Sequence, residues 1–71
     1  MAERKTDIRM KLDETTVQII TIALRRMYNS GEYTERQGEL LTYSLSRFTS
    51  AIGDFNHDRR AAGLPPLDTE V

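Results

Sequence analysis

A short segment near the start of the chain alternates charged and apolar side chains. Within residues 7–12 the apolar members are Ile8, Met10 and Leu12, and the basic members are Arg9 and Lys11. Such alternation places the apolar side chains on one face of an extended strand and the basic ones on the other. A chain of 71 residues offers no second strand for pairing. The segment is therefore either a loose tail or one half of a two-stranded ribbon formed with a second copy.

Chain length and cysteine content favour the alternative in which the segment pairs with a second copy of the chain. A single domain of 71 residues supplies roughly 3–5 kcal/mol from its own core, so small domains need further support. The absence of cysteine excludes disulfides, iron–sulfur clusters and thiolate zinc sites, and one histidine cannot build a histidine-rich metal site. We therefore expect a homodimer without metal or cofactor, and a chain this small is a poor enzyme candidate.

The global charge gives no support to nucleic-acid binding, but basic residues gather near the start. The net charge is −1, whereas residues 4–11 hold four basic side chains (Arg4, Lys5, Arg9 and Lys11) against one acid, Asp7. No segment has the length and hydropathy of a membrane span or a secretory signal. We expect a cytoplasmic protein.

Local signals define a first helix over about residues 14–29. Asp13 is a good N-cap, and Glu14 suits the first turn of the helix that follows. Apolar residues then recur at helical spacing, namely Val17, Ile20, Leu24 and Met27. Gly31 is free to take the left-handed conformation that ends a helix.

A second helix starts soon afterwards. Thr34 and Gln37 have the spacing of a capping box, with Tyr33 placed as a hydrophobic staple. The apolar positions continue at steps of four and three residues: Leu41, Leu45, Phe48, Ile52 and Phe55. Gly53 costs roughly 1 kcal/mol inside a helix. Either the second helix ends near residue 51 and a short third helix follows, or one helix continues to about residue 61.

The order of strand, helix, glycine-containing turn and helix resembles the ribbon-helix-helix family of DNA-binding proteins, which includes the methionine repressor, small phage repressors and many antitoxins. The resemblance covers residues 6–52. It rests on Ile8-x-Met10-x-Leu12-Asp13-Glu14 leading into the first helix, and on Gly31-x-x-Thr34 opening the second. It implies a mainly α fold in which one N-terminal strand pairs across a homodimer, followed by two helices and a short C-terminal helix or tail. Residues 1–5 would be a disordered arm, and residues 53–71 a C-terminal extension, partly helical and then disordered.

The resemblance also implies a DNA site. The ribbon would place Arg9 and Lys11 against base edges in the major groove, which is about 12 Å wide. The start of the second helix, with Thr34, Glu35 and Arg36, would hold a phosphate. Further phosphate contacts would come from Arg4 and Lys5. The expected dimer core consists of Ile8, Met10, Leu12, Val17, Ile20, Leu24, Leu41, Leu45 and Phe48.

The predicted function is that of a small homodimeric DNA-binding protein. It would act as a transcriptional repressor, an antitoxin-like autoregulator, or an accessory factor on plasmid or phage DNA. Its partners would be double-stranded DNA and a second copy. In antitoxins, C-terminal extensions often hold the toxin, so the resemblance also implies a protein partner for residues 53–71.

The near-heptad spacing of both helices leaves a second interpretation open. It equally suits a helical hairpin or a four-helix dimer that binds and regulates another protein without binding DNA. Residues 45–55 are weakly similar to small helical-hairpin phosphatase regulators of sporulation. The acidic residue of that motif is absent here, so the activity of those regulators is not carried over.

Overall fold

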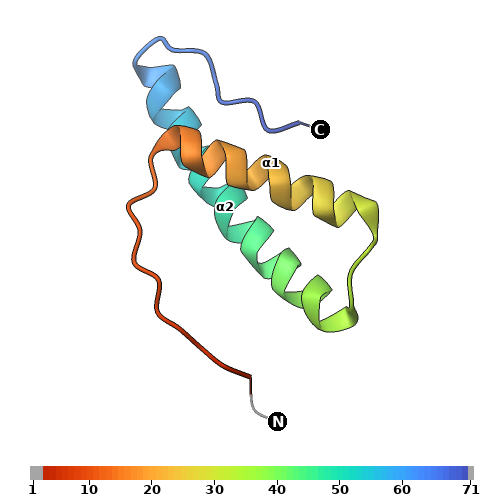
Figure 1. Ribbon diagram of the computed structural model, residues 1–71. Helices are drawn as coiled ribbons and strands as arrows, with labels where there is room; N and C mark the ends of the chain where they lie inside the picture. Colours follow the sequence, from red (N-terminus) through yellow and green to blue (C-terminus); the bar gives the residue numbers. More distant parts are fainter. Residues whose placement is uncertain (1–2, 71) are drawn as a thin grey trace.

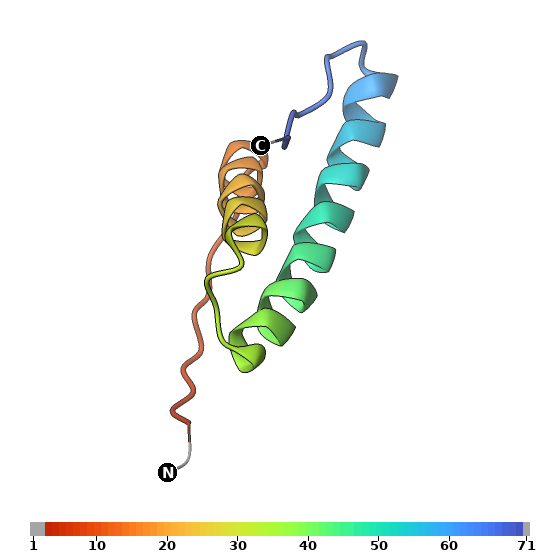
Figure 2. The ribbon, with the colours of Figure 1, turned by 90° about the vertical axis from the view of Figure 1, so that its right-hand side faces the viewer.

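The computed structural model describes residues 3–70, which form two α-helices joined as a hairpin (Figure 1). Helix α1 spans Glu14–Ser30, and helix α2 spans Glu35–Ala61. The 27 residues of α2 correspond to about 40 Å at 1.5 Å per residue, so α2 extends well past the start of α1 (Figure 2). Over residues 3–70, neither helix combines the length and the apolar character needed to cross a membrane.

Both ends of α1 follow the predicted signals. The Asp13 carboxylate accepts a hydrogen bond from the Thr16 amide at 2.8 Å. This bond satisfies one of the free amides at the helix start. At the other end Gly31 has φ of 69°, in the left-handed region that favours glycine. The predicted first helix is confirmed.

Helix α2 begins with the predicted capping box and continues without a break. The Thr34 hydroxyl accepts from the Gln37 amide at 3.1 Å, and the Gln37 side chain accepts from the Thr34 amide at 3.0 Å. The helix passes through Gly53, which has open space around it. Of the two alternatives for this region, the single long helix is therefore the one observed. It ends at Ala61, and Gly63 follows with φ of 74°.

Tyr33 packs back on the first turn of α2, as expected for a staple. A methyl group built on Gly38 would lie 3.1 Å from the Tyr33 ring. The Tyr33 hydroxyl also donates to the Tyr28 carbonyl at 3.3 Å, and the two rings stack with centroids 6.3 Å apart. These contacts hold the loop between the helices against the end of α1.

The predicted ribbon-helix-helix fold is wrong. Residues 6–12 are extended but form no strand, and no sheet occurs anywhere in residues 3–70. The side chains of Ile8 and Met10 are 74% and 66% exposed. A strand requires a neighbour to take up its backbone hydrogen bonds, and residues 3–70 supply none. The segment in which charged and apolar side chains alternate is therefore an extended arm and not a strand.

The core is small and lies in the single seam between α1 and α2. Its buried apolar members are Val17, Leu41 and Ile52. The most buried side chain, Thr21, is 1% exposed, and its hydroxyl donates to the Val17 carbonyl at 2.7 Å. Its polar atom is thus satisfied within its own helix, as burial requires. Of the predicted dimer core, Ile20, Leu24, Leu45 and Phe48 are only half-buried.

The N-cap of α1 leads to a prediction about pH. Hydrogen bonds from Thr16, from its side chain and then from its backbone, lower the pKa of the Asp13 carboxyl below its ordinary value. A lowered pKa in the folded state means stability that is present above the unfolded pKa and lost as pH falls through the folded pKa. We expect Asp13→Ala to lower the melting temperature at neutral pH, and this deficit to shrink in the acid range. Thermal unfolding followed by circular dichroism, at several pH values, measures the difference in melting temperature between Asp13→Ala and the unchanged protein.

Asp7→Ala is the matched control, because Asp7 is exposed on the arm and has no hydrogen bond or ion pair with another described residue. Its melting temperature should follow that of the unchanged protein at every pH. A deficit in Asp13→Ala that is constant with pH would contradict the role of the ionised cap.

Candidate protein-interaction surfaces

The residues predicted to bind DNA lie on the extended arm and at the start of α2. Arg9 and Lys11 are exposed on the extended arm, as are Arg4 and Lys5. Arg36 forms loose ion pairs with Glu3 at 3.6 Å and Glu39 at 3.9 Å.

At the start of α2 the Thr34 hydroxyl accepts a hydrogen bond from the Gln37 amide, and Glu35 adds a negative charge in the same turn. The described chain assembles no base-reading ribbon. At the predicted phosphate clamp the Thr34 oxygen serves as the helix cap, and the Glu35 carboxylate opposes an anion.

The two helices instead leave one long apolar surface uncovered, which we call the open face. Its members are Leu12, Ile20, Leu24, Met27, Leu40 and Phe48. On α1, Ile20, Leu24 and Met27 share a side because they are four and three residues apart. Met27 is 42% exposed and Leu40 is 45% exposed. The open face thus presents large apolar side chains from both helices.

Two hollows mark the open face where the helices meet. One has a volume of about 240 Å³ and is lined by Leu24, Met27, Gln37, Leu40, Leu41 and Ser44. The other has a volume of about 170 Å³ and is lined by Leu12, Val17, Arg47, Phe48 and Ala51. Ser44 and Phe48 lie one turn apart on α2, so the hollows are neighbours. The open face is therefore apolar and hollowed, a shape into which side chains of a second molecule can fit.

Four exposed charged residues lie along one side of α2 at the border of the open face, with Arg36 and Arg47 first and Asp54 and Asp58 after them; we call this row the charge stripe. Its change of sign belongs to this side alone, because α2 elsewhere carries Glu35 and Glu39 in its first half and Arg59 and Arg60 in its last turn. The Arg47 guanidinium lies 5.7 Å from the centre of the Tyr43 ring and donates to the Tyr43 hydroxyl at 3.0 Å. Arg47 is therefore held in place and is not a freely moving surface charge.

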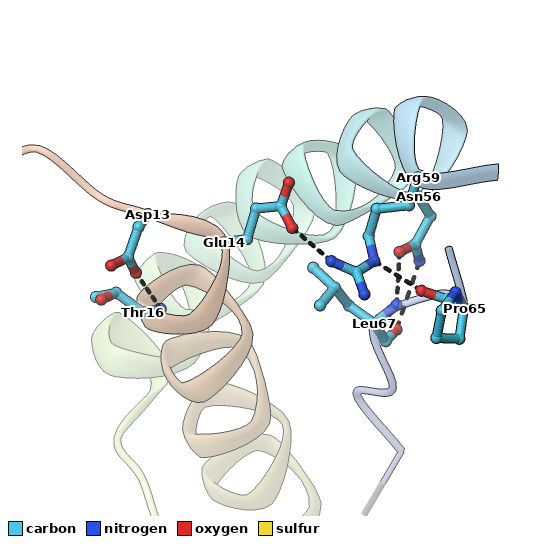
Figure 3. Close-up of polar contacts among 7 residues, drawn as sticks. All are labelled: Asp13, Glu14, Thr16, Asn56, Arg59, Pro65 and Leu67. Atoms are coloured by element: carbon cyan, nitrogen blue, oxygen red, sulfur yellow. Dashed lines mark hydrogen bonds and ion pairs between the residues drawn. The ribbon is translucent and has the colours of Figure 1, made fainter. Parts of the chain in front are cut away.

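A different surface, on the opposite side of the hairpin, is covered by the chain itself. After Gly63 the chain turns back, and residues 64–70 run as an extended tail beside both helices (Figure 1). The Asn56 side chain accepts from the Leu67 amide at 2.7 Å and donates to the Leu67 carbonyl at 3.4 Å (Figure 3). Arg59 donates to the Pro65 carbonyl at 2.7 Å.

Donors on α1 hold the other end of the tail. Gln18 donates to the Asp68 carbonyl at 2.8 Å, and Arg25 donates to the Thr69 carbonyl at 3.0 Å. Four side chains from two helices thus contact one extended segment. We call the surface formed by Gln18, Arg25, Asn56 and Arg59 the tail groove.

Arg59 also joins α2 to the start of α1. Its guanidinium lies 2.8 Å from the Glu14 carboxylate (Figure 3), with side chains 22% and 41% exposed. Glu14 was identified from the sequence only as a favourable first-turn acid. In the folded chain this ion pair also orients the Arg59 guanidinium so that its Nε donates to the Pro65 carbonyl of the tail.

None of the four tail-groove residues was predicted from the sequence. Each is a common polar residue on a helix. Gln18 and Arg25 reach carbonyls 50 and 44 residues away, and Asn56 and Arg59 reach residues beyond the end of their own helix, so no helical pattern identifies the four. The single histidine, His57, is exposed on α2. Residues 3–70 contain no cluster of three His, Cys, Asp or Glu side chains that could hold a metal ion.

Comparisons of the chain with protein-family models, curated proteins and solved structures give no match. The open face and the tail groove are the two surfaces of the described chain whose geometry bears on function.

The Asn56 contact leads to a prediction about the tail. Asn56→Ala removes the acceptor for the Leu67 amide, and one hydrogen bond contributes about 0.5–1.5 kcal/mol. We expect the Leu67 amide to exchange with solvent roughly fivefold faster. Hydrogen exchange followed by NMR measures this rate residue by residue.

His57→Ala is the control, because His57 is the exposed neighbour of Asn56 on the same helix. It should leave the exchange of the Leu67 amide unchanged. Equal exchange rates in the Asn56→Ala variant and the unchanged protein would show that this contact does not hold the tail.

Proposed function

We propose that this chain is a protein-binding regulator that works as a homodimer of helical hairpins. Two copies pair through their open faces into a four-helix bundle, and the dimer acts by binding another protein. The observation that supports this most directly is the open face itself, where Met27 and Leu40 remain 42% and 45% exposed beside the hollow they line. Contiguous exposed apolar surface of this kind marks interaction sites.

The composition of α1 supports burial on more than one side. Besides the seam with α2, it carries apolar residues on its outer side, where Ile19 is 61% exposed. Ile19, Ile22, Ala23 and Arg26 line a further hollow of about 420 Å³ there. Gln18 and Arg25 occupy the side of α1 that faces the tail, whereas apolar residues occupy both its seam and its outer side. In a four-helix dimer α1 would acquire neighbours that one hairpin cannot provide.

Charge complementarity favours a second copy as the occupant of the open face. Arg47 and Asp54 are seven residues apart, or two turns, and therefore lie on the same side of α2. Between them lies a hollow lined by Ser46, Arg47, Ser50, Ala51 and Asp54. When two copies of α2 meet antiparallel about this point, Arg47 of each copy faces Asp54 of the other. A parallel arrangement would place like charges together, so the stripe favours two-fold, antiparallel pairing.

The regulatory role is supported by the architecture and by size. The observed hairpin agrees with the second interpretation of the sequence, a helical hairpin or four-helix dimer that binds and regulates another protein. A chain of 8.2 kDa with its polar residues spread over the helix surfaces is suited to binding.

DNA binding is the second candidate, because the four basic side chains of the arm are all exposed. Within residues 3–13 they are opposed by Glu3, Asp7 and Asp13. Affinity that depends on phosphate contacts falls steeply with salt, by about 0.9 log units per contact for each decade. Sizing chromatography with mixed DNA at low salt therefore tests this candidate, and co-elution that salt abolishes would support it.

The open face leads to a prediction about oligomeric state. We expect the unchanged protein to elute with the mass of two chains of 8.2 kDa. Met27→Glu and Leu40→Glu should each produce monomers, since each buries an unpaired carboxylate in the interface. Size-exclusion chromatography with light scattering measures the mass, and circular dichroism checks that the helices persist.

Leu64→Glu is the matched control, because Leu64 is 51% exposed and lies on the turn after α2, away from the open face. It should remain dimeric. An unchanged protein that is monomeric at millimolar concentration would refute the dimer.

The charge stripe leads to a separate prediction about orientation. Arg47→Asp and Asp54→Arg should each weaken dimerisation by roughly tenfold, because each places like charges together at two symmetric positions. The double variant should recover most of the lost affinity, since the charges are then complementary again. Analytical ultracentrifugation at low salt measures the dissociation constants. Additive losses in the double variant would exclude the antiparallel pairing of α2.

A further inference from the structure

We propose that the tail groove is a recognition site for an extended peptide segment of another protein, and that residues 64–70 occupy it in the isolated chain. This inference rests on the proposed function, since it names the kind of partner that the dimer would bind. The groove lies on the side of the hairpin opposite the open face, so both surfaces can be occupied at once.

The contacts in the groove recognise backbone. Asn56 uses both ends of its amide on a single residue, accepting from the Leu67 amide and donating to the Leu67 carbonyl (Figure 3). This reciprocal pair requires an extended residue with both groups free, and it places no demand on the side chain. Any extended segment that presents one such residue can therefore form it.

The remaining donors also reach carbonyl groups. Arg59, Gln18 and Arg25 donate to the carbonyls of Pro65, Asp68 and Thr69 at 2.7, 2.8 and 3.0 Å. Together with Asn56 they engage four carbonyls within five consecutive residues. A row of fixed side-chain donors along an extended backbone is how a protein binds a peptide with limited dependence on its sequence.

The tail also indicates which segments fit best. Pro65 and Pro66 favour the extended polyproline conformation before binding, which reduces the entropy lost on docking. Leu67 is half-buried against the helices. Arg25 also donates to the Thr69 hydroxyl at 3.2 Å. The preferred ligand is thus an extended segment with proline, then an apolar residue, then a hydroxyl residue two positions later.

The ligand comes from another protein and not from the second copy of this chain. In the proposed dimer the second copy covers the open face, on the opposite side of the hairpin. Seven extended residues reach at most about 25 Å, and the tail starts from the end of α2 that projects beyond α1 (Figure 2). Exchange of tails between the two copies would require each tail to pass around its own hairpin.

Competition with the tethered tail sets a condition on the ligand. A segment joined by a short linker acts at an effective concentration in the millimolar range. A free ligand must therefore make additional contacts. Beside Glu70 the groove opens into a hollow of about 460 Å³ lined by Arg25, Tyr28, Asn29, Leu45, Thr49 and Glu70. A longer segment reaches this hollow and its Arg25 side chain.

The test loosens the tail and leaves the groove intact. Leu67→Pro removes the amide that Asn56 accepts from, and proline suits the extended conformation. The probe is a fluorescent synthetic peptide of residues 63–70, and its binding to the full-length chain is followed by anisotropy. We expect Leu67→Pro to bind the probe at least tenfold more tightly than the unchanged protein does, because the internal competitor is weakened.

Two comparisons identify the groove as the binding site. Adding Asn56→Ala to Leu67→Pro should weaken binding roughly fivefold, since one hydrogen bond is lost, whereas adding His57→Ala should leave it unchanged. A probe that itself carries proline at position 67 should bind Leu67→Pro more weakly by a similar factor, and Asn56→Ala should weaken the binding of that probe no further. If Leu67→Pro keeps its helices and binds no probe at millimolar concentration, the peptide site is refuted.

A measurement on the unchanged protein covers the case in which Leu67→Pro fails to fold. Excess unlabelled probe should shift the NMR signals of Asp68 and Thr69 towards those of a free peptide. Unmoved signals would also refute the site. The mass of the unchanged protein, measured separately, reports on the dimer, so failure of the peptide site and failure of the proposed dimer are told apart.

Discussion

Two helices packed side by side can bury only the side chains in the seam between them, and this limit governs the rest of the structure. In residues 3–70 the seam buries three apolar residues, Val17, Leu41 and Ile52, together with Thr21. The hairpin has two remaining sides along this seam. One is covered by the tail, which the side chains of both helices hold through its backbone. The other keeps large apolar residues exposed, and a small core of this kind gains most from a second subunit.

The two sides use different interactions, and this difference separates their roles. On the open face, burial of apolar side chains such as Met27 and Leu40 would supply free energy in proportion to the area removed from water. In the tail groove, individual hydrogen bonds contribute little net free energy but require a particular backbone geometry. The first kind of surface suits a permanent contact between copies. The second suits a contact that forms and is exchanged, with Asn56 selecting an extended residue.

The helices could be predicted from residues that interact within one turn, whereas contacts between residues far apart in the sequence could not be predicted. Asp13, Gly31 and the Thr34–Gln37 pair act within one turn, so their spacing alone identified the helix ends. The end of α2 stayed open because Gly53 is compatible with either alternative, and its surroundings, which are open space, favour neither. The predicted strand is wrong because the alternation of side chains gives a segment two different faces but does not supply a second strand to pair with it. The tail contacts of Gln18 and Arg25 join residues 50 and 44 positions apart, which no local pattern reveals.

The alternation in the arm still has a physical consequence, although it forms no strand. Leu12 lines the same hollow of the open face as Phe48 and Ala51, which places the base of the arm at the edge of that face. Ile8 and Met10 continue the same apolar side of the arm and are exposed. In a dimer formed through the open face, the arm of each copy would therefore begin at the border of the interface, with its apolar side available to cover it. The alternating pattern thus describes an extended arm with one apolar side and not the strand of a ribbon.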